Sequence, residues 1–390
     1  MKVLFIKSGL SKREKYFLPI RHKEPIELLY LANGIQPFIK DKVDLDFIDI
    51  KLGDTSYKKQ LLDIDPDLIV FYAEKDQAEA ITRLASLSKE ITPQTYIALL
   101  GDLTEDFESP YIDFLYRDSP IESFNETLIG IEVDRSMEEI KRNVDNANRL
   151  TTKPLNKPLR NLAAEYSKDY YFLQYPSVIE LHTIERMDLN EDIIIGKAEG
   201  ELRKEEEIAG DIKDNPNNGI FLKDLDIWSD KYRLKKLLDI LEEEGLNRTY
   251  IAHGDWTTIL EEESLLQRFS KLGLKVMVMD LDFPKDEDAW ILKQEVMRML
   301  RKHGVEPVLV ISEVLSKDDE KALVFWLKNN KEGLVILTEQ VLVENSSIYK
   351  ELSLSVSIIF GWIKEHSLGE ALRRRREYKS IYNAQITNHN

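Results

Sequence analysis

Residues 65–102 read DPDLIVFYAEKDQAEAITRLASLSKEITPQTYIALLGD. This stretch decides the fold class, because it alternates two short apolar runs with one amphipathic run. Leu68–Tyr72 and Tyr96–Leu100 have the length and the composition of buried strands, and residues 78–90 have the spacing of a helix. Two buried strands joined by a helix predict a parallel βαβ unit.

The same alternation continues on both sides of this unit. Further strands are predicted at residues 2–6, 44–50 and 114–116, and further helices at 25–39 and 121–128. We therefore expect residues 1–130 to form a Rossmann-like, doubly wound α/β domain, whose ligands would sit at the carboxyl ends of its strands.

A second strand–helix rhythm begins near residue 192. It predicts strands at residues 193–196, 219–222, 249–252, 275–279, 307–311 and 334–337, five of them followed by a helix. Six consecutive units predict a partial (β/α)₆ barrel over residues 191–345. Residues 131–190 are expected to be a connector, and residues 346–390 a C-terminal helical tail.

Composition excludes several classes of function. The formal net charge of the 390 residues is -17, so nucleic acid and membranes are not expected partners. The apolar runs are too short for a bilayer-spanning helix or a signal peptide, and we expect a cytoplasmic protein. The chain has no cysteine, which excludes disulfides, cysteine nucleophiles and thiolate metal sites. A small-molecule or peptide substrate is expected, and a partner protein is an alternative.

Three segments of the first domain carry a family resemblance. They are EPIELLYLA at 24–32, DPDLIV at 65–70 and YIDFLYRDSPIESF at 111–124, in this order, and neither GxGxxG nor GxxxxGK[ST] accompanies them. Together they resemble the B12-binding domain of cobalamin-binding radical S-adenosylmethionine (SAM) enzymes. The resemblance implies a bound cobalamin at the carboxyl edge of the sheet. The residues expected to contact it are Gly9, His22, Ala73, Glu74, Gly101, Asp102 and Ser119.

The second domain resembles the radical SAM barrel of the same family, with one departure. That family carries C-x-x-x-C-x-x-C after its first barrel strand, and here residues 195–203 read IGKAEGELR. The resemblance therefore implies a diverged member that holds no iron–sulfur cluster and does not start radical chemistry in the usual way.

Acidic residues follow the predicted strands of the second domain. The expected metal ligands are Asp224, Asp226, His253 and Asp255, and the expected catalytic residues are His253, Asp255, Asp280 and Asp282. An alternative is that the acids are solvated loop residues or helix caps, and that His253 is structural.

Three functions stay open at this point. The first is cobalamin-dependent chemistry without radical initiation, of the methyl-transfer type, which would make the protein a transferase. The second is a catalytically silent homologue that binds a partner. The third is an enzyme with metal or acid–base chemistry at an acidic barrel mouth.

Overall fold

The structure is a computed structural model, and its described residues fall into two compact units. The first lies within residues 1–170 and the second from residue 171 on, apart from Arg21, which groups with the second. The structure describes residues 1–9, 21–22, 24–50, 57–73, 77–101, 104, 107–149, 158–159, 162–163, 166, 170–172, 175–182, 203–215, 219–223, 228, 230–254, 256–281, 287–311, 316–319, 321 and 334–337.

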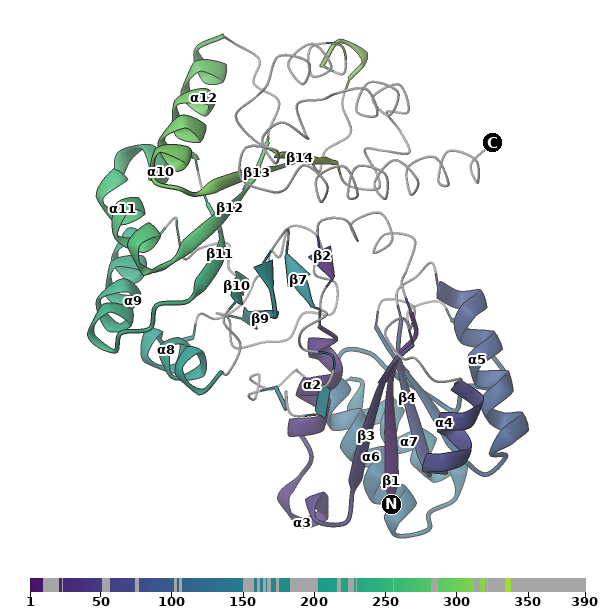
Figure 1. The fold of residues 1–390 in the computed structure, drawn as a ribbon. Helices are drawn as coiled ribbons and strands as arrows, with labels where there is room; N and C mark the ends of the chain where they lie inside the picture. The colour runs from purple at the N-terminus through teal and green to yellow at the C-terminus, as the bar shows by residue number, and fades with distance from the viewer. Residues whose placement is uncertain are drawn as a thin grey trace. The chain divides into compact units, whose positions relative to one another are not determined.

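The first unit is built on a five-stranded parallel sheet (Figure 1). Its strands in spatial order are β3 (Asp44–Asp49), β1 (Lys2–Lys7), β4 (Leu68–Tyr72), β5 (Tyr96–Leu100) and β6 (Phe114–Tyr116). The order reverses between β1 and β4, because β1 pairs with β3 on one side and with β4 on the other. This is the doubly wound arrangement that the sequence predicts.

Helices cover both faces of this sheet, as alternating strand side chains require. One face packs on α2 (Ile26–Asn33), α6 (Pro120–Glu132) and α7 (Met137–Ala147). The other packs on α4 (Tyr57–Ile64) and α5 (Ala78–Ile91). The expected helix at 25–39 is instead α2 followed by α3 (Pro37–Lys40), because Pro37 cannot continue α2 and starts a new turn.

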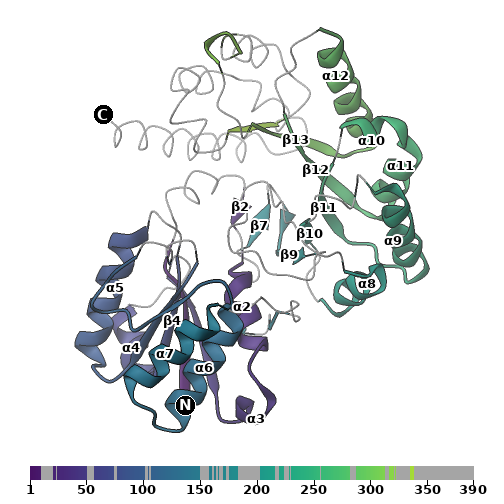
Figure 2. The same cartoon turned by 180° about the vertical axis from the view of Figure 1, so that it is seen from behind.

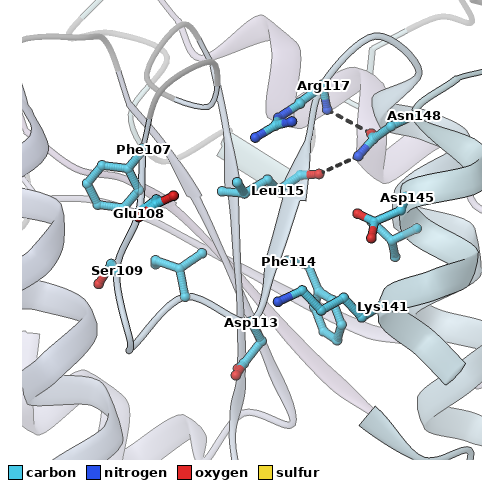
Figure 3. A pocket seen from close by; sticks show the side chains of 12 residues that line it. Phe107, Glu108, Ser109, Asp113, Phe114, Leu115, Arg117, Lys141, Asp145 and Asn148 are labelled. Carbon is cyan, nitrogen blue, oxygen red and sulfur yellow. Dashed lines mark hydrogen bonds between the residues drawn. The ribbon is translucent and has the colours of Figure 1, made fainter. Parts of the chain in front are cut away.

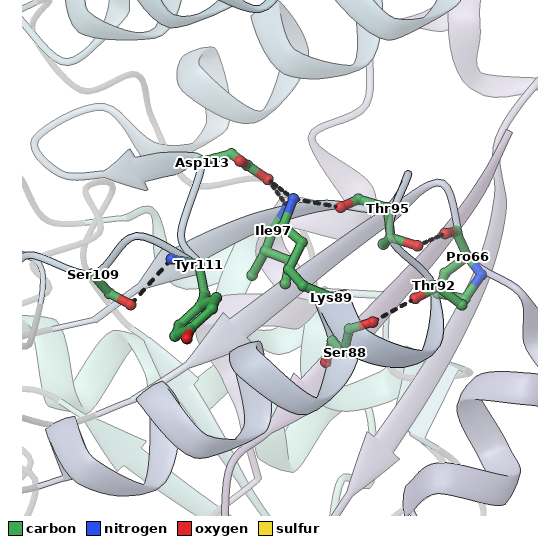
Figure 4. Close-up of polar contacts among 9 residues, drawn as sticks. All are labelled: Pro66, Ser88, Lys89, Thr92, Thr95, Ile97, Ser109, Tyr111 and Asp113. Atoms are coloured by element: carbon green, nitrogen blue, oxygen red, sulfur yellow. Dashed lines mark hydrogen bonds and ion pairs between the residues drawn. The ribbon is translucent and has the colours of Figure 1, made fainter.

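A polar network holds the amino end of β5 (Figure 4). The Lys89 ammonium donates to the Asp113 carboxylate at 2.7 Å and to the Thr95 carbonyl at 2.8 Å. The same carboxylate accepts from the backbone N–H of Ile97 at 2.8 Å. These bonds join the end of α5 to the segment before β6, and so fix the register of the last two strands.

The outer edge of β6 is capped by one side chain (Figure 3). Asn148, which ends α7, accepts from the backbone N–H of Arg117 at 2.9 Å and donates to the carbonyl of Leu115 at 2.8 Å. Its oxygen also accepts from the Ser123 hydroxyl at 2.7 Å. The amide thus takes the place of a neighbouring strand, and an unpaired edge is what natural sheets avoid.

The second unit contains a six-stranded parallel sheet whose strands lie in sequential order. Its strands are β9 (Val178–His182), β10 (Gly219–Lys223), β11 (Thr249–His253), β12 (Leu274–Asp280), β13 (Glu306–Ile311) and β14 (Leu334–Leu337). Five of the six predicted strands are therefore present. Sequential parallel order is the one a (β/α) barrel has, and closure into a barrel stays a prediction.

Helices of the second unit lie along one side of its sheet in both views (Figures 1 and 2). They are α8 (Glu205–Asp214), α9 (Lys231–Glu243), α10 (Trp256–Glu261), α11 (Glu263–Leu272) and α12 (Glu287–Lys302). Their apolar faces form one continuous core with the sheet, in which Tyr250 of β11 packs on Phe269 of α11 with ring centroids 5.4 Å apart.

The start of the second sheet differs from the expectation. Its first strand is β9, which lies inside the stretch expected to be a connector, while the predicted strand at 193–196 lies outside the described residues. The same stretch contributes α7 and Tyr166 to the core of the first unit. Tyr166 packs edge-on against Phe47 with ring centroids 5.5 Å apart, a contact between residues far apart in the sequence.

A third, three-stranded sheet has the order β2 (Arg21–His22), β7 (Tyr171–Phe172), β8 (Tyr175–Pro176). The backbone of His22, one of the residues expected to contact a cofactor, belongs to β2. The expected C-terminal helical tail lies outside the described residues. Among the helices that the structure describes, none combines the length and the apolar character needed to cross a bilayer.

Candidate functional site

The first candidate site is the carboxyl edge of the five-stranded sheet, at the point between β1 and β4 where the strand order reverses. Parallel sheets of this type bind ligands at that point, because the loops on either side leave in opposite directions. Ser8 and Gly9 follow β1, Ala73 follows β4, and Gly101 follows β5. Three of the residues expected to contact a cofactor are therefore brought to one edge.

Gly9 and Gly101 have similar backbones and different surroundings. Their φ angles are +102° and +111°, in the left-handed region that favours glycine. Among the described residues, no atom lies within 4 Å of a Cβ placed on Gly9, whereas a Cβ on Gly101 would collide with the carbonyl oxygen of Ala73. Gly9 therefore leaves open space at the edge, and Gly101 is required by the packing of β5 against β4.

A buried bridge links the loops that follow β1 and β4. The Ser8 hydroxyl donates to the Tyr72 carbonyl at 3.0 Å and lies 3.2 Å from the Gln77 amide oxygen. The Gln77 amide nitrogen donates to the carbonyl of Gly9 at 3.3 Å. Both side chains are buried, so the bridge is screened from water. Gln77, at the start of α5, was not among the residues expected from the sequence.

Charged groups are buried beside this edge. Lys7 is 1% exposed and Asp49 is 0% exposed, and the two are register partners at the ends of β1 and β3. Tyr72 donates to the carboxylate of Glu27, in the first turn of α2, at 3.4 Å. Burying charge is costly unless opposite charges or hydrogen bonds compensate it. An internal lysine among acids is therefore part of the floor under the strand ends.

The remaining residues expected around a cofactor are only partly placed. Ser119 is fully buried, and its backbone carbonyl accepts from the backbone N–H of Ser123 in the first turn of α6. Its backbone therefore forms the start of this helix. Glu74 and Asp102 lie outside the described residues, as does the side chain of His22.

The second candidate site is the carboxyl end of β11 and β12. His253, the last residue of β11, is buried, and its ring stacks on Phe221 with centroids 5.8 Å apart and planes at 24°. It is the register partner of Val278, so Asp280 lies two positions further on the same face of the next strand. Tyr250 packs on the helices, and His253 therefore faces the opposite side of the sheet.

A tryptophan contacts Asp280, and a lysine packs on that tryptophan. The indole N–H of Trp256 donates to the Asp280 carbonyl at 2.6 Å. The ammonium of Lys293, on α12, lies 4.6 Å from the centre of the Trp256 ring, a cation–π contact. Lys293 is 8% exposed, although its place in a charged helix gives no signal of burial. Trp256 therefore links the end of β12 to α12 through one hydrogen bond and one cation–π contact.

The expected acidic cluster is only partly visible. Asp224, Asp226, Asp255 and Asp282 lie outside the described residues. Within the ranges that are described, no group of three or more histidine or acidic side chains is placed to hold a metal ion. Convergence of the six residues thus stays a prediction, with only His253 and Asp280 shown to share a face.

A pocket of about 360 Å³ lies along the outer edge of β6 (Figure 3). Its lining includes the apolar Phe107, Phe114 and Val144 and the basic Arg117 and Lys141. The Arg117 guanidinium also donates to the carbonyl of Thr104, whose hydroxyl donates to the carbonyl of Gly101. Hydrogen bonds therefore connect this pocket with the carboxyl edge of β5.

The residues at the first site fit a flat cobalt macrocycle. Such a ligand needs small residues where it approaches the backbone: Gly9 has no side chain, Ala73 has only a methyl group, and the described residues leave the space beside Gly9 open. The residues of the chain do not fit a thiolate-ligated iron–sulfur cluster, because the sequence contains no cysteine.

No protein-family model matches the sequence, and no curated protein matches it either. Solved structures do match in fold. The radical SAM methyltransferase TsrM from Kitasatospora setae, solved with cobalamin and a [4Fe-4S] cluster, superposes with a TM-score of 0.58 at 10% identity, over 86% of this chain and 74% of TsrM. The TsrM structure with tryptophan substrate and a SAM analogue gives the same TM-score and identity, over 86% of this chain and 72% of TsrM.

The cobalamin-dependent SAM radical enzyme OxsB, solved with aqua-cobalamin and SAM, superposes with a TM-score of 0.59 at 12% identity. The match covers 92% of this chain and 56% of OxsB, so this chain spans little more than half of that enzyme. At these identities the likeness concerns the fold. The chain therefore shares its α/β fold, built on two parallel sheets, with the TsrM and OxsB structures, and its own sequence has no cysteine.

Proposed function

We propose that this protein binds cobalamin at the carboxyl edge of its five-stranded sheet and uses it without an iron–sulfur cluster. The observation that carries the proposal is the space that the described residues leave open at Gly9, at the reversal point between β1 and β4. The fold likeness to TsrM and OxsB, whose structures contain cobalamin, supports the choice of ligand.

The residues of the edge would each do a distinct task. Gly9 would let the macrocycle approach the backbone, and Ala73 would add a small side chain beside it. Gly101 would keep β5 close to β4, which makes the edge of the sheet continuous. The Ser8–Gln77 bridge would hold the Gly9 loop in place. Pre-positioned groups of this kind reduce the entropy lost on binding.

The absence of cysteine supports polar methyl transfer, which needs no radical initiation. When bound, cobalamin would supply a cobalt centre able to take up and pass on a methyl group without radical initiation. His253 and Asp280 share one face of the second sheet, at the strand ends where parallel sheets of this type carry their sites. They would orient a small-molecule or peptide substrate, and the His253 imidazole would move a proton.

The proposal is tested by titrating the protein with hydroxocobalamin and following the corrin absorption bands. We expect saturable binding with one site per chain. Gly9→Ala should weaken it roughly tenfold, because one added methyl in a tight contact costs about 1–3 kcal/mol. Gly245→Ala is the matched control, since Gly245 also has a positive φ of +66° and nothing within 4 Å of its Cβ. Absence of binding by the wild type would refute the proposal.

A catalytically silent homologue that still binds cobalamin would give the same absorption spectrum as an active enzyme. A turnover assay separates these two possibilities. A cobalamin-loaded protein that transfers no methyl group to any candidate nucleophile would favour the silent homologue. A corrin-free protein with metal-dependent activity would favour acid–base or metal chemistry at the second site.

A further inference from the structure

The pocket along the outer edge of β6 is a groove between two walls that pack on opposite faces of the first sheet (Figure 3). One wall is the segment before β6, and its Phe107 belongs to the core shared with α4 and α5. The other wall is α7, and its Val144 belongs to the core shared with α2 and α6. The groove has a volume of about 360 Å³, within the range of small-molecule sites of about 300–1,000 Å³. It lies beside β6, two strands away from β4, and is therefore separate from the reversal point of the sheet.

One side chain prevents the strand of a partner from pairing with β6 in this groove. The Asn148 amide accepts from the backbone N–H of Arg117 at 2.9 Å and donates to the carbonyl of Leu115 at 2.8 Å. An added strand binds through backbone groups of this kind, and here both are taken by a buried side chain. The groove therefore suits a small ligand and not strand addition.

Five charged side chains line the groove, and four of them are available to a ligand. Asp113 is already held by the polar network at the amino end of β5. Glu108 on one wall, and Lys141 and Asp145 on α7, are exposed and form no ion pair with another described residue. The fourth is Arg117, which is exposed as well. Because two positive and two negative groups face the groove, a ligand that carries both charges complements it.

Arg117 and Asp145 are placed to bind neighbouring charges of one ligand. The Nε of Arg117 donates to the carbonyl of the buried Thr104 at 3.1 Å, which fixes the guanidinium. Its terminal N–H groups are left for a carboxylate, to which arginine donates two parallel hydrogen bonds. Asp145 precedes Asn148 by three residues on α7, about 4.5 Å along the helix axis, and its carboxylate points toward β6 in Figure 3. A carboxylate and an ammonium group on one carbon atom can therefore contact Arg117 and Asp145 together.

The rest of the lining is largely apolar and includes Phe114 and Leu115. We propose that the groove binds a free α-amino acid with a large apolar side chain. The carboxylate of the ligand binds the Arg117 guanidinium, its ammonium group binds the Asp145 carboxylate, and its side chain lies along the apolar lining. Lys141 extends from α7 toward β6 in Figure 3 and covers that side chain with its hydrocarbon stem. The site does not require cobalamin, so its test is independent of the proposed function.

The first experiment compares four ligands on the wild-type protein by isothermal titration calorimetry. They are L-leucine, 4-methylpentanoate, which lacks the ammonium group, 3-methylbutylamine, which lacks the carboxylate, and L-leucyl-L-leucine, in which the two charges are one residue further apart. We expect L-leucine to bind with a dissociation constant of about 1 mM or lower. Each of the other three ligands should bind at least about fivefold more weakly, because each loses one charge-assisted contact.

The results that would overturn the proposal are equally distinct. No saturable binding of L-leucine up to about 10 mM would exclude an amino-acid site. A loss smaller than fivefold for 4-methylpentanoate or 3-methylbutylamine would show that the two charges are not both recognised. A dipeptide that binds as tightly as L-leucine, or more tightly, would show that the groove takes a segment of peptide chain.

The second experiment locates the site with matched variants. Arg117→Gln and Asp145→Asn should each weaken L-leucine binding at least about fivefold. The controls Arg142→Gln and Asp118→Asn change the same charges at exposed neighbouring positions outside the lining, and should leave the dissociation constant within about twofold.

Asp145→Asn keeps the test valid if Arg117→Gln is unstable, because Asp145 bonds to no other described residue and its loss leaves the fold intact. Circular dichroism checks the fold of each variant. Unchanged binding in Asp145→Asn would place the amino acid elsewhere and overturn the proposal. Equal losses in the control variants would show a general effect of charge, which also contradicts it.

Discussion

Gly101 is one of the residues expected to contact a cofactor, and its structural role can be tested separately from ligand binding. In Gly101→Ala the new methyl group would meet the carbonyl oxygen of Ala73, a backbone atom that cannot move aside without shifting β4. The φ of +111° adds a second cost, because residues with a Cβ are strained at positive φ. We expect about 1–2 kcal/mol from the backbone angle and about 1–3 kcal/mol from the contact, or about 2–5 kcal/mol in all.

Gly9→Ala is the matched variant, because it shares the first cost and lacks the second. Its φ is +102°, and its Cβ would have nothing within 4 Å. We expect it to lose only about 1–2 kcal/mol of unfolding free energy. The difference between the two variants, about 1–3 kcal/mol, then measures the contact with Ala73.

The assay is urea denaturation followed by circular dichroism, with the transition of the first unit compared among wild type, Gly101→Ala and Gly9→Ala. The urea midpoint should be highest for wild type, lower for Gly9→Ala and lowest for Gly101→Ala. Equal midpoints for the two variants would refute the reasoning, because the close approach of β5 to β4 would then carry no energy. A Gly101→Ala variant as stable as wild type would refute the conformational argument as well.

Three further predictions concern the edge cap, a surface ion pair and the missing thiolates. Asn148→Ala should lower the unfolding free energy by about 3 kcal/mol, because three hydrogen bonds are lost and backbone groups of β6 are left unsatisfied. The control is Asn146→Ala at an exposed position, which should change the unfolding free energy by less than about 0.5 kcal/mol. Equal effects of the two variants would contradict the capping role of Asn148. The Lys302 ammonium, and next the His303 ring, lower the pKa of Glu263 from its usual 4.5, so this stabilisation is complete above that value and is lost as the pH falls through the folded pKa. Glu263→Gln should accordingly be less stable than wild type near pH 7 in urea titrations, and the difference should shrink as the pH falls below 4.5; a difference that does not shrink in acid would exclude this cause. Anaerobic incubation with iron and sulfide should give no stoichiometric cluster, and a thiolate-type absorption band near about 400 nm would disprove this.

Local sequence determined the fold class and most of its elements. The apolar runs at Leu68–Tyr72 and Tyr96–Leu100 became buried parallel strands, and five of the six strands expected in the second domain are present. These signals are strong because a strand buried on both faces must be apolar along its whole length. The sequence also excluded a thiolate-ligated cluster without any structure, since that conclusion depends on composition alone.

Elements that depend on distant partners were not predictable. β9 has the mixed sequence VIELH, and it is a strand because β10 pairs with it in parallel register. Lys293 looks like one more charged helix residue, and its sequence gives no sign that it is buried and contacts the ring of Trp256 from α10. Side-chain burial is a property of the packed neighbours, which periodicity within one segment does not report.

The candidate site shows the same division between sequence and tertiary structure. The sequence placed Gly9, Ala73 and Gly101 at the carboxyl ends of strands, because strand ends follow from local pattern. Only the tertiary structure separated an open glycine from one held by the Ala73 carbonyl, and only it brought Gln77 across to the loop after β1. The reason is physical: strand ends are set by neighbouring residues in the chain, whereas the space around a side chain is set by residues about 70 positions away that the sheet brings together.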